Sequence, residues 1–516
     1  MKKTLTTLKI SIILIFITSF INAQNHPFPQ NLKYAEGSIK PSNYTQLELN
    51  QHTALFYLDW QKKFLHNNEC GDNQYFIRYR PTGEDITVSE AHGYGMMILA
   101  YFAGFDVFAK DKFDGMYNFY INHLAQTEQY PNSKLLSWRQ TTGCNTRQKD
   151  LGTATDGDID VAFALLLAHY QWGSEGRVNY KQTALDMIND IMRIEIHPEF
   201  NTILLGDWVD LKAKYGTGTR TSDFILDHFR SFENATGEKR WHKVLEKCYF
   251  IIEHLQENSS PKSGLLPDFV IDADTDNPKP PKGQYLENAT GDGNYFYNAC
   301  RDPWRIAVDY LVSGDERGKD ACNKINEWIK SNTSKNPENI KSGYKLNGGN
   351  LTGNDYQSSA FFAPFVVSAM VDSKHQKWLN KTYETLINFE NEEYYEGTIK
   401  MLSLLALSGN YWVPESFPNE LNKTINTKKE VSFNLPKDPI QKGKLLTLQM
   451  KGIDKGEYTL ELIDNTDQLI FTMDLKMIQN KKYTLNTSAL PIGKYRVAFL
   501  AEKFSKEYEI TIIDKK

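Results

Sequence analysis

The chain has 516 residues, of which 40% are hydrophobic and 13% aromatic, and its formal net charge is −5. This length exceeds one ordinary core, so we expect one large domain and a smaller one. The mildly negative charge argues against an extended nucleic-acid footprint, and no nucleic-acid partner is expected.

The N-terminus has the pattern of an export signal. Lys2 and Lys3 supply positive charge, residues 10–21 form an apolar run, and Ala23 is a small residue at the expected cleavage site. The run is short for a membrane span, and no later segment has 18 consecutive apolar residues. We predict a signal peptide over residues 1–23, no membrane span, and a secreted or cell-surface protein. An uncleaved anchor is the alternative.

The cysteines are too few and too scattered for a structural zinc site. None of the five forms a CxxC pair, so neither a metal nor another cofactor is expected. The odd count leaves at least one thiol free, and export permits a disulfide. The sequence does not choose a pair among Cys70, Cys144, Cys248, Cys300 and Cys322.

The rest of the chain divides into two regions that differ in their pattern of apolar residues. Four segments have the apolar spacing of helices, namely residues 91–105, 160–170, 241–255 and 297–311. Polar, Gly-rich loops separate them, and no strong alternation of apolar and polar residues appears. We therefore predict a mainly α domain over residues 30–417, followed by a linker over residues 418–430.

From about residue 431 the pattern changes to strands. Segments 445–450, 458–463 and 495–500 are rich in β-forming residues and bounded by Gly, Asp or Asn, which predicts a small β-sandwich over residues 431–516. The Gly-x-Tyr strands that begin at Gly456 and Gly493 resemble the C-terminal sorting domain of type IX secretion. The resemblance implies that the type IX secretion machinery is a partner of this protein. A generic carbohydrate-binding or stabilising sandwich is the alternative.

The first segment that contains candidate catalytic residues is residues 87–97. Ser89 can cap a following helix, which puts Glu90 in its first turn. An acid there could simply complement the helix dipole. Gly93 and Gly95 weaken the helix, and they fit a place where a ligand or a backbone must approach closely.

The second segment carries three acids, Asp156, Asp158 and Asp160, at the start of an apolar helix. Capping needs only one of them. A calcium loop of the EF-hand type is excluded, because its positions six and twelve are occupied by Val161 and Leu167.

The third segment, residues 285–305, is dense in polar and aromatic side chains. Arg301 and Arg305 are four residues apart on one helical face and could hold carboxylates in place. A purely structural ion-pair network is the alternative.

Together the three segments resemble family 8 of the glycoside hydrolases. Residues 154–158 match the family signature Ala-Ser/Thr-Asp-Ala/Gly-Asp, with a departure at Val161, where the family prefers Ile or Met. Residues 89–96 match the segment of the general acid, and residues 301–305 match the third landmark. The resemblance implies an (α/α)6 barrel with an open substrate cleft, inversion at the anomeric carbon and no required metal.

One position departs from the common pattern. Many members have their general base in Tyr-Asp-Ala, which here reads Tyr297-Asn298-Ala299. An amide cannot act as that base. A subgroup with this Asn, which includes chitosanases and β-glucanases, is thought to place a Glu in a preceding loop. Glu287 occupies such a loop here, and Asp292 and Asp302 are the other carboxylates nearby.

An inverting hydrolase needs one protonated carboxyl and one ionised carboxylate about 6.5–9.5 Å apart. On the resemblance we predict Glu90 as the acid and Glu287 as the base, with Asp156 and Asp158 binding the distorted sugar. Burial and the field of a neighbouring Asp must raise the pKa of Glu90 against the helix dipole. The substrate-binding candidates are Tyr94, Trp138, Trp208, Asn298, Arg301 and Arg305.

The predicted function is secreted, endo-acting, inverting hydrolysis of a β-1,4-linked polysaccharide, either chitosan or β-glucan/cellulose. A chitosan cleft should carry extra acids for the glucosamine ammonium, and Asp207, Asp223 and Glu287 are candidates. A xylan-active hydrolase of the same family, a polysaccharide lyase and a non-catalytic glycan-binding protein with Asn298 in place of its base are the alternatives.

Overall fold

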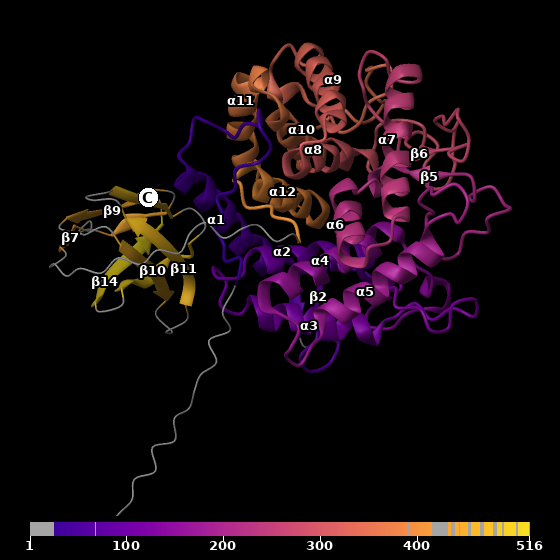
Figure 1. Ribbon diagram of the computed structural model, residues 1–516. Helices are drawn as coiled ribbons and strands as arrows, with labels where there is room; N and C mark the ends of the chain where they lie inside the picture. The colour runs from indigo at the N-terminus through magenta and orange to yellow at the C-terminus, as the bar shows by residue number, and fades with distance from the viewer. Residues whose placement is uncertain are drawn as a thin grey trace, which may run out of the picture.

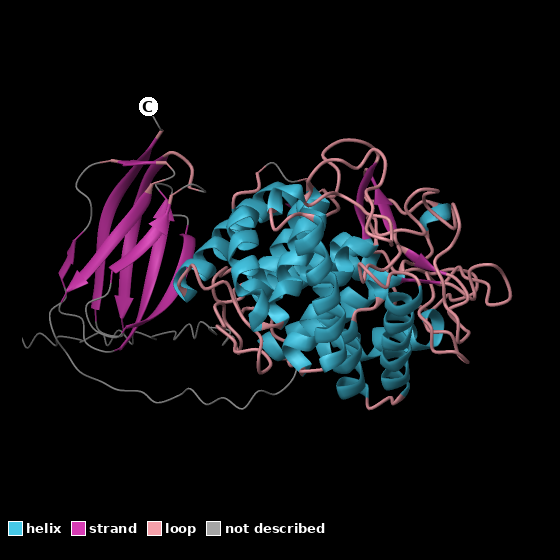
Figure 2. Ribbon diagram, turned by 90° about the horizontal axis from the view of Figure 1, so that it is seen from above, coloured by secondary structure: helices cyan, strands magenta, loops and turns pink. Residues whose placement is uncertain are grey.

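The computed structural model describes residues 25–67, 69–390, 393–414, 432–434, 439–442, 444–451, 456–464, 469–477, 482–487, 490–501 and 504–514. The predicted signal peptide and linker lie outside these residues. The helices belong to the first part of the chain and the long strands to its last part (Figures 1 and 2). No helix in the described ranges is both long and apolar enough to cross a membrane.

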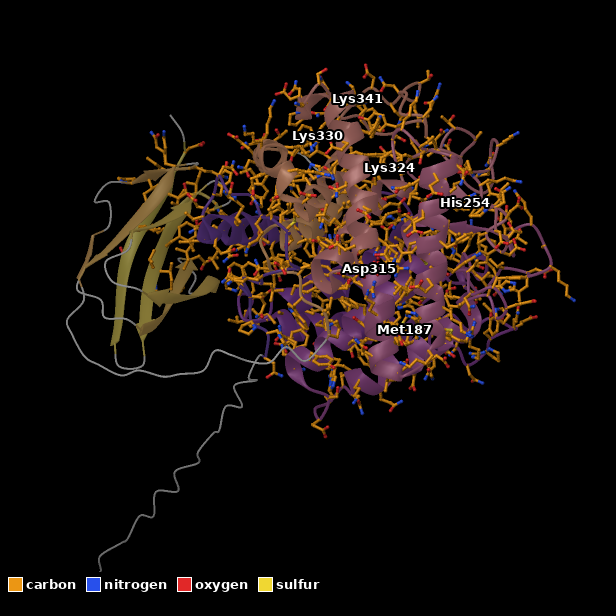
Figure 3. All side chains as sticks on the ribbon, turned by 45° about the horizontal axis from the view of Figure 1, so that its top comes forward. Met187, His254, Asp315, Lys324, Lys330 and Lys341 are labelled. Atoms are coloured by element: carbon orange, nitrogen blue, oxygen red, sulfur yellow. A yellow bond between two sulfur atoms is a disulfide. The ribbon has the colours of Figure 1, made fainter. Side chains whose placement is uncertain are left out.

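Twelve α-helices occur in the described residues, and they alternate in character. The odd-numbered helices bury one apolar face and carry polar or charged residues elsewhere, such as His254, Lys324 and Lys330 (Figure 3). They are α1 (Gln46–Phe64), α3 (Ala109–Asn122), α5 (Tyr180–Asp190), α7 (Arg240–Asn258), α9 (Glu316–Asn332) and α11 (Gln376–Ile387). The even-numbered helices are mostly buried on all sides. They are α2 (Ser89–Tyr101), α4 (Thr155–Trp172), α6 (Leu226–Thr236), α8 (Asp302–Ser313), α10 (Ser359–Ser368) and α12 (Tyr394–Leu407).

The even-numbered helices form a closed inner ring. Each contacts the next along the chain, and α12 contacts α2. Each odd-numbered helix packs against an even-numbered neighbour from outside, as α3 does on α2 and α7 on α6. A helix that is apolar all round must be covered on all sides, and a one-faced helix can cover it. This double ring is the arrangement expected of an (α/α)6 barrel, and the mainly α fold is confirmed.

Residues at the starts of the inner helices meet at one end of the ring. Glu90 at the start of α2 contacts Tyr394, the first residue of α12, and Arg301, which directly precedes α8. The loops before these helices carry two short antiparallel ladders. One pairs β3 (Asp85–Val88) with β4 (Arg139–Thr141), and the other pairs β5 (Thr219–Arg220) with β6 (Phe269–Val270). Functional side chains therefore gather at this end.

Glycines allow α2 and α4 to pack with their backbones close together. A Cβ on Gly93 would lie 2.6 Å from the Asp160 Cβ, and one on Gly157 would lie 2.4 Å from the Ser89 Oγ. The expectation that Gly93 marks a close backbone approach is confirmed. Glu90 lies in the first turn as predicted, but the expected cap is wrong: Ser89 is itself the first helical residue, and Val88 precedes it.

A disulfide ties a hairpin to the loop after β4. Cys70 lies in the turn between β1 (Leu65–Asn67) and β2 (Tyr75–Ile77), and its Cα lies 5.3 Å from that of Cys144. The remaining cysteines in the described residues are free and buried, namely Cys248, Cys300 and Cys322. The structure thus chooses the pair that spacing left open.

The C-terminal segments are strands, as predicted. One sheet has the order β11-β10-β13-β14-β8, and a second has the order β12-β9-β7. In the first sheet Leu460 and Leu462 are buried at alternate positions, which fits one apolar sheet face. The strands are β7 (Ser432–Asn434), β8 (Ile440–Gln441), β9 (Leu445–Lys451), β10 (Gly456–Asp464), β11 (Leu469–Met477), β12 (Lys482–Asn486), β13 (Gly493–Ala501) and β14 (Phe504–Ile513).

Candidate active site

Arg301 organises the cluster at the end of the inner ring. It closes a short 3₁₀ turn, Ala299–Arg301, that leads into α8. Its Nη1 donates to Glu90 Oε2 at 2.8 Å and to Asp156 Oδ2 at 2.9 Å. Its Nη2 donates to Ser222 Oγ at 2.8 Å and to Asn298 Oδ1 at 3.1 Å. One guanidinium therefore joins three inner-helix starts, and its predicted role of holding carboxylates agrees with this geometry.

Glu90 is a carboxyl with competing influences on its protonation. Its Oε1 accepts a hydrogen bond from the Tyr394 hydroxyl at 3.0 Å. Burial raises the pKa of Glu90 above its ordinary value and the charge of Asp156 adds to the rise, while Arg301 and Tyr394 act against it. The net direction is upward, so Glu90 holds a proton more readily than a free glutamate.

The influences on the pKa of Asp156 have the opposite net effect. Burial alone would raise its pKa, but Arg220 and Arg301 outweigh burial and hold the pKa of Asp156 well below its usual range. Arg220 Nη2 lies 3.1 Å from Asp156 Oδ1. A carboxyl whose pKa is lowered thus lies beside Glu90, a carboxyl whose pKa is raised.

Glu287 is linked to Arg301 through Asn298 and not by a direct hydrogen bond. Its Oε2 accepts a hydrogen bond from Asn298 Nδ2 at 3.0 Å, and its Oε1 lies 3.9 Å from Arg220 Nη1. Because the Asn298 Oδ1 already accepts from Arg301, the amide must present its N–H to Glu287. The Glu287 side chain is 47% exposed, so its carboxylate can reach water.

The two other nearby acids are enclosed. Asp292 is fully buried and accepts hydrogen bonds from four consecutive backbone N–H groups, those of residues 285–288. Asp302 is buried at the start of α8, and burial raises the pKa of Asp302 well above its ordinary value. Neither presents a carboxylate to solvent as Glu287 does.

Asp158 lies outside this cluster. It is fully buried, and its Oδ1 accepts from the Leu136 N–H at 2.7 Å. Burial and the neighbouring Glu195 raise the pKa of Asp158 well above its ordinary value. The structure does not bring Asp158 to Arg301, because two residues along a helix rotate the side chain by about 200° away from the face of Asp156, and its predicted role in sugar binding stays a prediction.

A second buried network lies beneath Arg301. Arg305 Nη2 donates to Asp160 Oδ2 at 3.0 Å and to the Tyr94 hydroxyl at 3.1 Å, and Arg301 Nη1 donates to the same hydroxyl at 3.2 Å. Tyr94 is fully buried and Arg305 nearly so. The structure therefore places both side chains in the core, and the predictions that Tyr94 stacks on sugar and that Arg305 binds substrate stay predictions. Both residues support Arg301 from the core.

The two predicted tryptophans differ in exposure. Trp138 is half-buried, and the Arg139 guanidinium lies over its ring at 4.1 Å. Trp208 is 45% exposed and meets Tyr215 edge to face. Trp208 thus remains a candidate sugar platform, and Trp138 has part of its ring covered by a cation.

Sequence reasoning missed three residues of the cluster: Arg220, Ser222 and Tyr394. Arg220 and Ser222 precede α6, and Tyr394 begins α12. None sits in a recognisable short motif. Only their position shortly before or at the start of an inner helix, a region that Glu90 and Asp156 also occupy, could have pointed to them.

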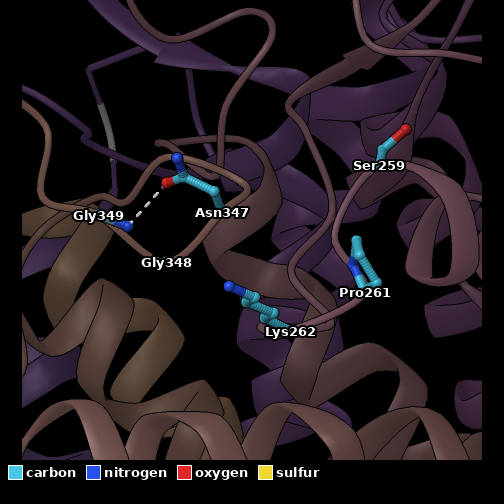
Figure 4. A pocket seen from close by; sticks show the side chains of 6 residues that line it. All are labelled: Ser259, Pro261, Lys262, Asn347, Gly348 and Gly349. Atoms are coloured by element: carbon cyan, nitrogen blue, oxygen red, sulfur yellow. Dashed lines mark hydrogen bonds between the residues drawn. The ribbon is translucent and has the colours of Figure 1, made fainter.

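A cavity of about 480 Å³ lies apart from this chemistry (Figure 4). It is lined by Ser259, Pro261, Lys262, Asn347, Gly348 and Gly349. None of these residues carries a carboxylate or belongs to the cluster around Arg301. The groups that can transfer protons are therefore in the cluster and not in this cavity.

The matches to known proteins cover the helical region that carries this cluster. A model described as "Glycosyl hydrolases family 8" matches residues 44–409. A "Beta-glucanase" of Niallia circulans is 43% identical over 390 residues, covering 76% of this chain and 92% of the relative. An "Endoglucanase" of Bacillus sp. (strain KSM-330) is 35% identical over 414 residues, covering 79% of this chain and 86% of the relative. The apo structure of a β-1,3-1,4-glucanase from Paenibacillus sp. X4 matches with a TM-score of 0.71 and 43% identity, covering 76% of this chain and 100% of that chain.

Proposed function

Because the chain belongs to glycosyl hydrolase family 8 and is a glycosidase that acts on O-glycosyl bonds, we propose that it is a secreted, endo-acting β-glucanase that cleaves β-1,4 linkages with inversion. The observation that carries this proposal is that Arg301 donates directly to one carboxyl, that of Glu90, and is linked through Asn298 to a second, that of Glu287.

Glu90 is the general acid. Burial raises the pKa of this carboxyl, and the ionised Asp156 beside it favours the protonated form further. Protonation of the leaving oxygen by a positioned acid is worth about 10²–10⁴-fold in rate. The hydrogen bonds from Arg301 and Tyr394 hold the carboxyl in one orientation for this transfer.

Glu287 is the general base. Asn298 donates to one of its oxygens, which leaves the other oxygen, near Arg220, free to take a proton from water. A guanidinium and an amide separate Glu287 from Glu90, so the two carboxyls are not in contact. An inverting hydrolase needs about 6.5–9.5 Å between its two carboxyls to leave room for the attacking water, and a separated pair fits that requirement better than a touching one.

Asp156 provides fixed negative charge at the cleavage point. It is buried and held by Arg220 and Arg301. The transition state of glycoside hydrolysis has oxocarbenium-ion character. A carboxylate that stays ionised can stabilise that positive charge and can accept a hydrogen bond from a sugar hydroxyl.

The charges of the cluster favour a neutral glucan over chitosan. Of the acids expected to meet a glucosamine ammonium, Asp223 is fully buried and bonded to Arg220, and Asp207 is buried and accepts from the Thr153 N–H. Arg220 itself brings positive charge next to Glu287. The names of the two relatives, a β-glucanase and an endoglucanase, point in the same direction.

The test is hydrolysis of a panel of polysaccharides. Mixed-linkage β-glucan and carboxymethyl cellulose should release reducing ends faster than chitosan or xylan, with viscosity falling early, as endo cleavage requires. Proton NMR of the first products should show the α-anomer. Faster cleavage of chitosan or xylan would overturn the assignment of β-glucan as the substrate. A β-anomer as the first product would overturn the inverting mechanism. Binding of polysaccharide without cleavage would favour a non-catalytic glycan-binding protein.

Export and the C-terminal region are part of the proposal. The N-terminal pattern of charge, apolar run and Ala23 supports cleavage before Gln24. The two C-terminal sheets support a β-sandwich, and its Gly-x-Tyr strands support a sorting role. N-terminal sequencing and intact mass of the protein recovered from culture medium test both cleavage and sorting.

A further inference from the structure

We propose that Asp292 is a positioning residue that presets the loop of Glu287 for catalysis. This inference rests on the proposed role of Glu287 as the general base. Asp292 does not reach substrate; it acts through the backbone that carries Glu287.

The contacts of Asp292 are concentrated on one stretch of chain. Its Oδ2 accepts from the N–H groups of Tyr285, Leu286 and Glu287 at 2.7, 2.7 and 3.0 Å, and its Oδ1 accepts from Asn288 at 2.7 Å. Consecutive N–H groups that converge on one anion form a backbone nest. The backbone of Glu287 is thus tied directly to the Asp292 carboxylate, although residues 287–290 are exposed.

Asp292 is itself fixed to a rigid part of the site. The Phe269 N–H donates to the Asp292 carbonyl at 2.9 Å, and Phe269 lies in β6, which pairs with β5. Strand β5 carries Arg220, which contacts both Asp156 and Glu287. Asp292 therefore links the loop of Glu287 to the same ladder that places the cation beside Asp156.

The flanking glycines fit this tight placement. A Cβ on Gly293 would lie 2.2 Å from the Pro281 carbonyl oxygen, and one on Gly291 would lie 2.3 Å from the Phe296 ring. The Gly-Asp-Gly sequence therefore lets the loop close around a buried carboxylate. An exposed loop with no such centre would sample many positions, and a displacement of about 1 Å can cost 10²-fold in rate.

The experiment compares Asp292→Asn with wild type and with Asp106→Asn. Asp106 is a matched control, since it is also a buried loop aspartate that accepts a backbone N–H, that of Phe108, after the opposite end of α2. We expect Asp292→Asn to lower kcat on β-glucan by about 10²-fold with KM changed less than about threefold. Asp106→Asn should keep the wild-type kcat even where it lowers Tm.

Amide hydrogen exchange directly measures the protection of the backbone N–H groups that bond to Asp292. In the wild-type protein the N–H groups of residues 285–288 should be protected despite the exposed loop, and in Asp292→Asn they should exchange faster while the barrel helices do not. Unprotected amides in the wild type, or a wild-type kcat in Asp292→Asn, would overturn the proposal. Since the wild-type measurement needs no variant, a misfolded Asp292→Asn would still leave the proposal testable.

Failure of this inference is separable from failure of the proposed function. If Glu287→Ala stays active, the base assignment is wrong, whatever Asp292 does. If Asp292→Ala, and not Glu287→Ala, forms a glycosyl azide with added azide, Asp292 is the base itself and the positioning role is overturned.

Discussion

Gly93 of α2 faces Asp160 of α4 so closely that a Cβ on the glycine would lie 2.6 Å from the Asp160 Cβ. Two further contacts of that Cβ would be with backbone atoms, Gly157 O at 3.1 Å and Val161 N at 3.2 Å. None of these neighbours can rotate away. This contact sets the spacing of the two helix starts that carry Glu90 and Asp156.

We therefore expect Gly93→Ala to lower the free energy of unfolding by about 1–3 kcal/mol through overpacking. Ala has a higher helix propensity than Gly by about 1 kcal/mol, so a net loss means that the packing effect is the larger one. Activity should fall too, because Glu90 shifts relative to Asp156. Gly176→Ala, where nothing lies within 4 Å, is the control in urea denaturation and should be neutral.

Glu90→Gln should abolish hydrolysis and leave the fold intact, because only the transferable proton is lost. We expect a loss of about 10²–10⁴-fold in kcat on an unactivated polysaccharide. Glu48→Gln is the control, since Gln keeps the capping box at the start of α1. Retention of more than about a tenth of the wild-type turnover by Glu90→Gln would remove Glu90 from the acid role.

Glu287→Ala should lose nearly all hydrolysis and then form an inverted glycosyl azide when azide is added. Removal of the base opens room for a small anion that needs no deprotonation. Asp302→Ala, which removes an enclosed carboxyl nearby, should not form this product. The measurement is product analysis by mass spectrometry and NMR, and glycosyl azide from Asp302→Ala alone would contradict the assignment.

Glu195→Gln should make stability less dependent on pH. Burial raises the pKa of Glu195 from 4.5 to about 8, so the folded protein keeps a proton that the unfolded chain releases. The free energy of unfolding of the wild type should therefore fall between about pH 4.5 and 8, by at most about 1.4 kcal/mol per pH unit for this group. Urea denaturation from pH 5 to 8 should show a flatter curve for the variant, and parallel curves would contradict this.

Truncation after Pro414 should leave hydrolysis of soluble β-glucan within about twofold of the full chain. The inner ring is complete at Leu407, and the residues that follow still contact the barrel: the Tyr411 hydroxyl donates to Asp227, and the Trp412 carbonyl accepts from the Tyr101 hydroxyl. The described C-terminal strands pair among themselves in two sheets and form no ladder with the described strands of the barrel. A folded but inactive truncated protein would show that the C-terminal region contributes to catalysis.

Local pattern was sufficient for several features of this protein. Apolar periodicity predicted the helices around residues 91–105 and 241–255, and β-forming runs predicted the C-terminal strands. The order of three short motifs predicted the family and the mainly α fold. These features are local because hydrogen-bonding pattern and side-chain periodicity are decided within a few residues of each other.

Tertiary structure alone decided which of these residues meet around Arg301. Asp156 and Asp158 look equivalent in sequence, but helix geometry places one beside Arg301 and buries the other near Glu195. Tyr94 and Arg305 were predicted to bind sugar, and ring closure puts them in the core. The Cys70–Cys144 pair and the meeting of Arg220, Tyr394 and Glu287 around one site depend on segments far apart in the chain. Such meetings are set by how the twelve described helices close their ring, which no local stretch of sequence encodes.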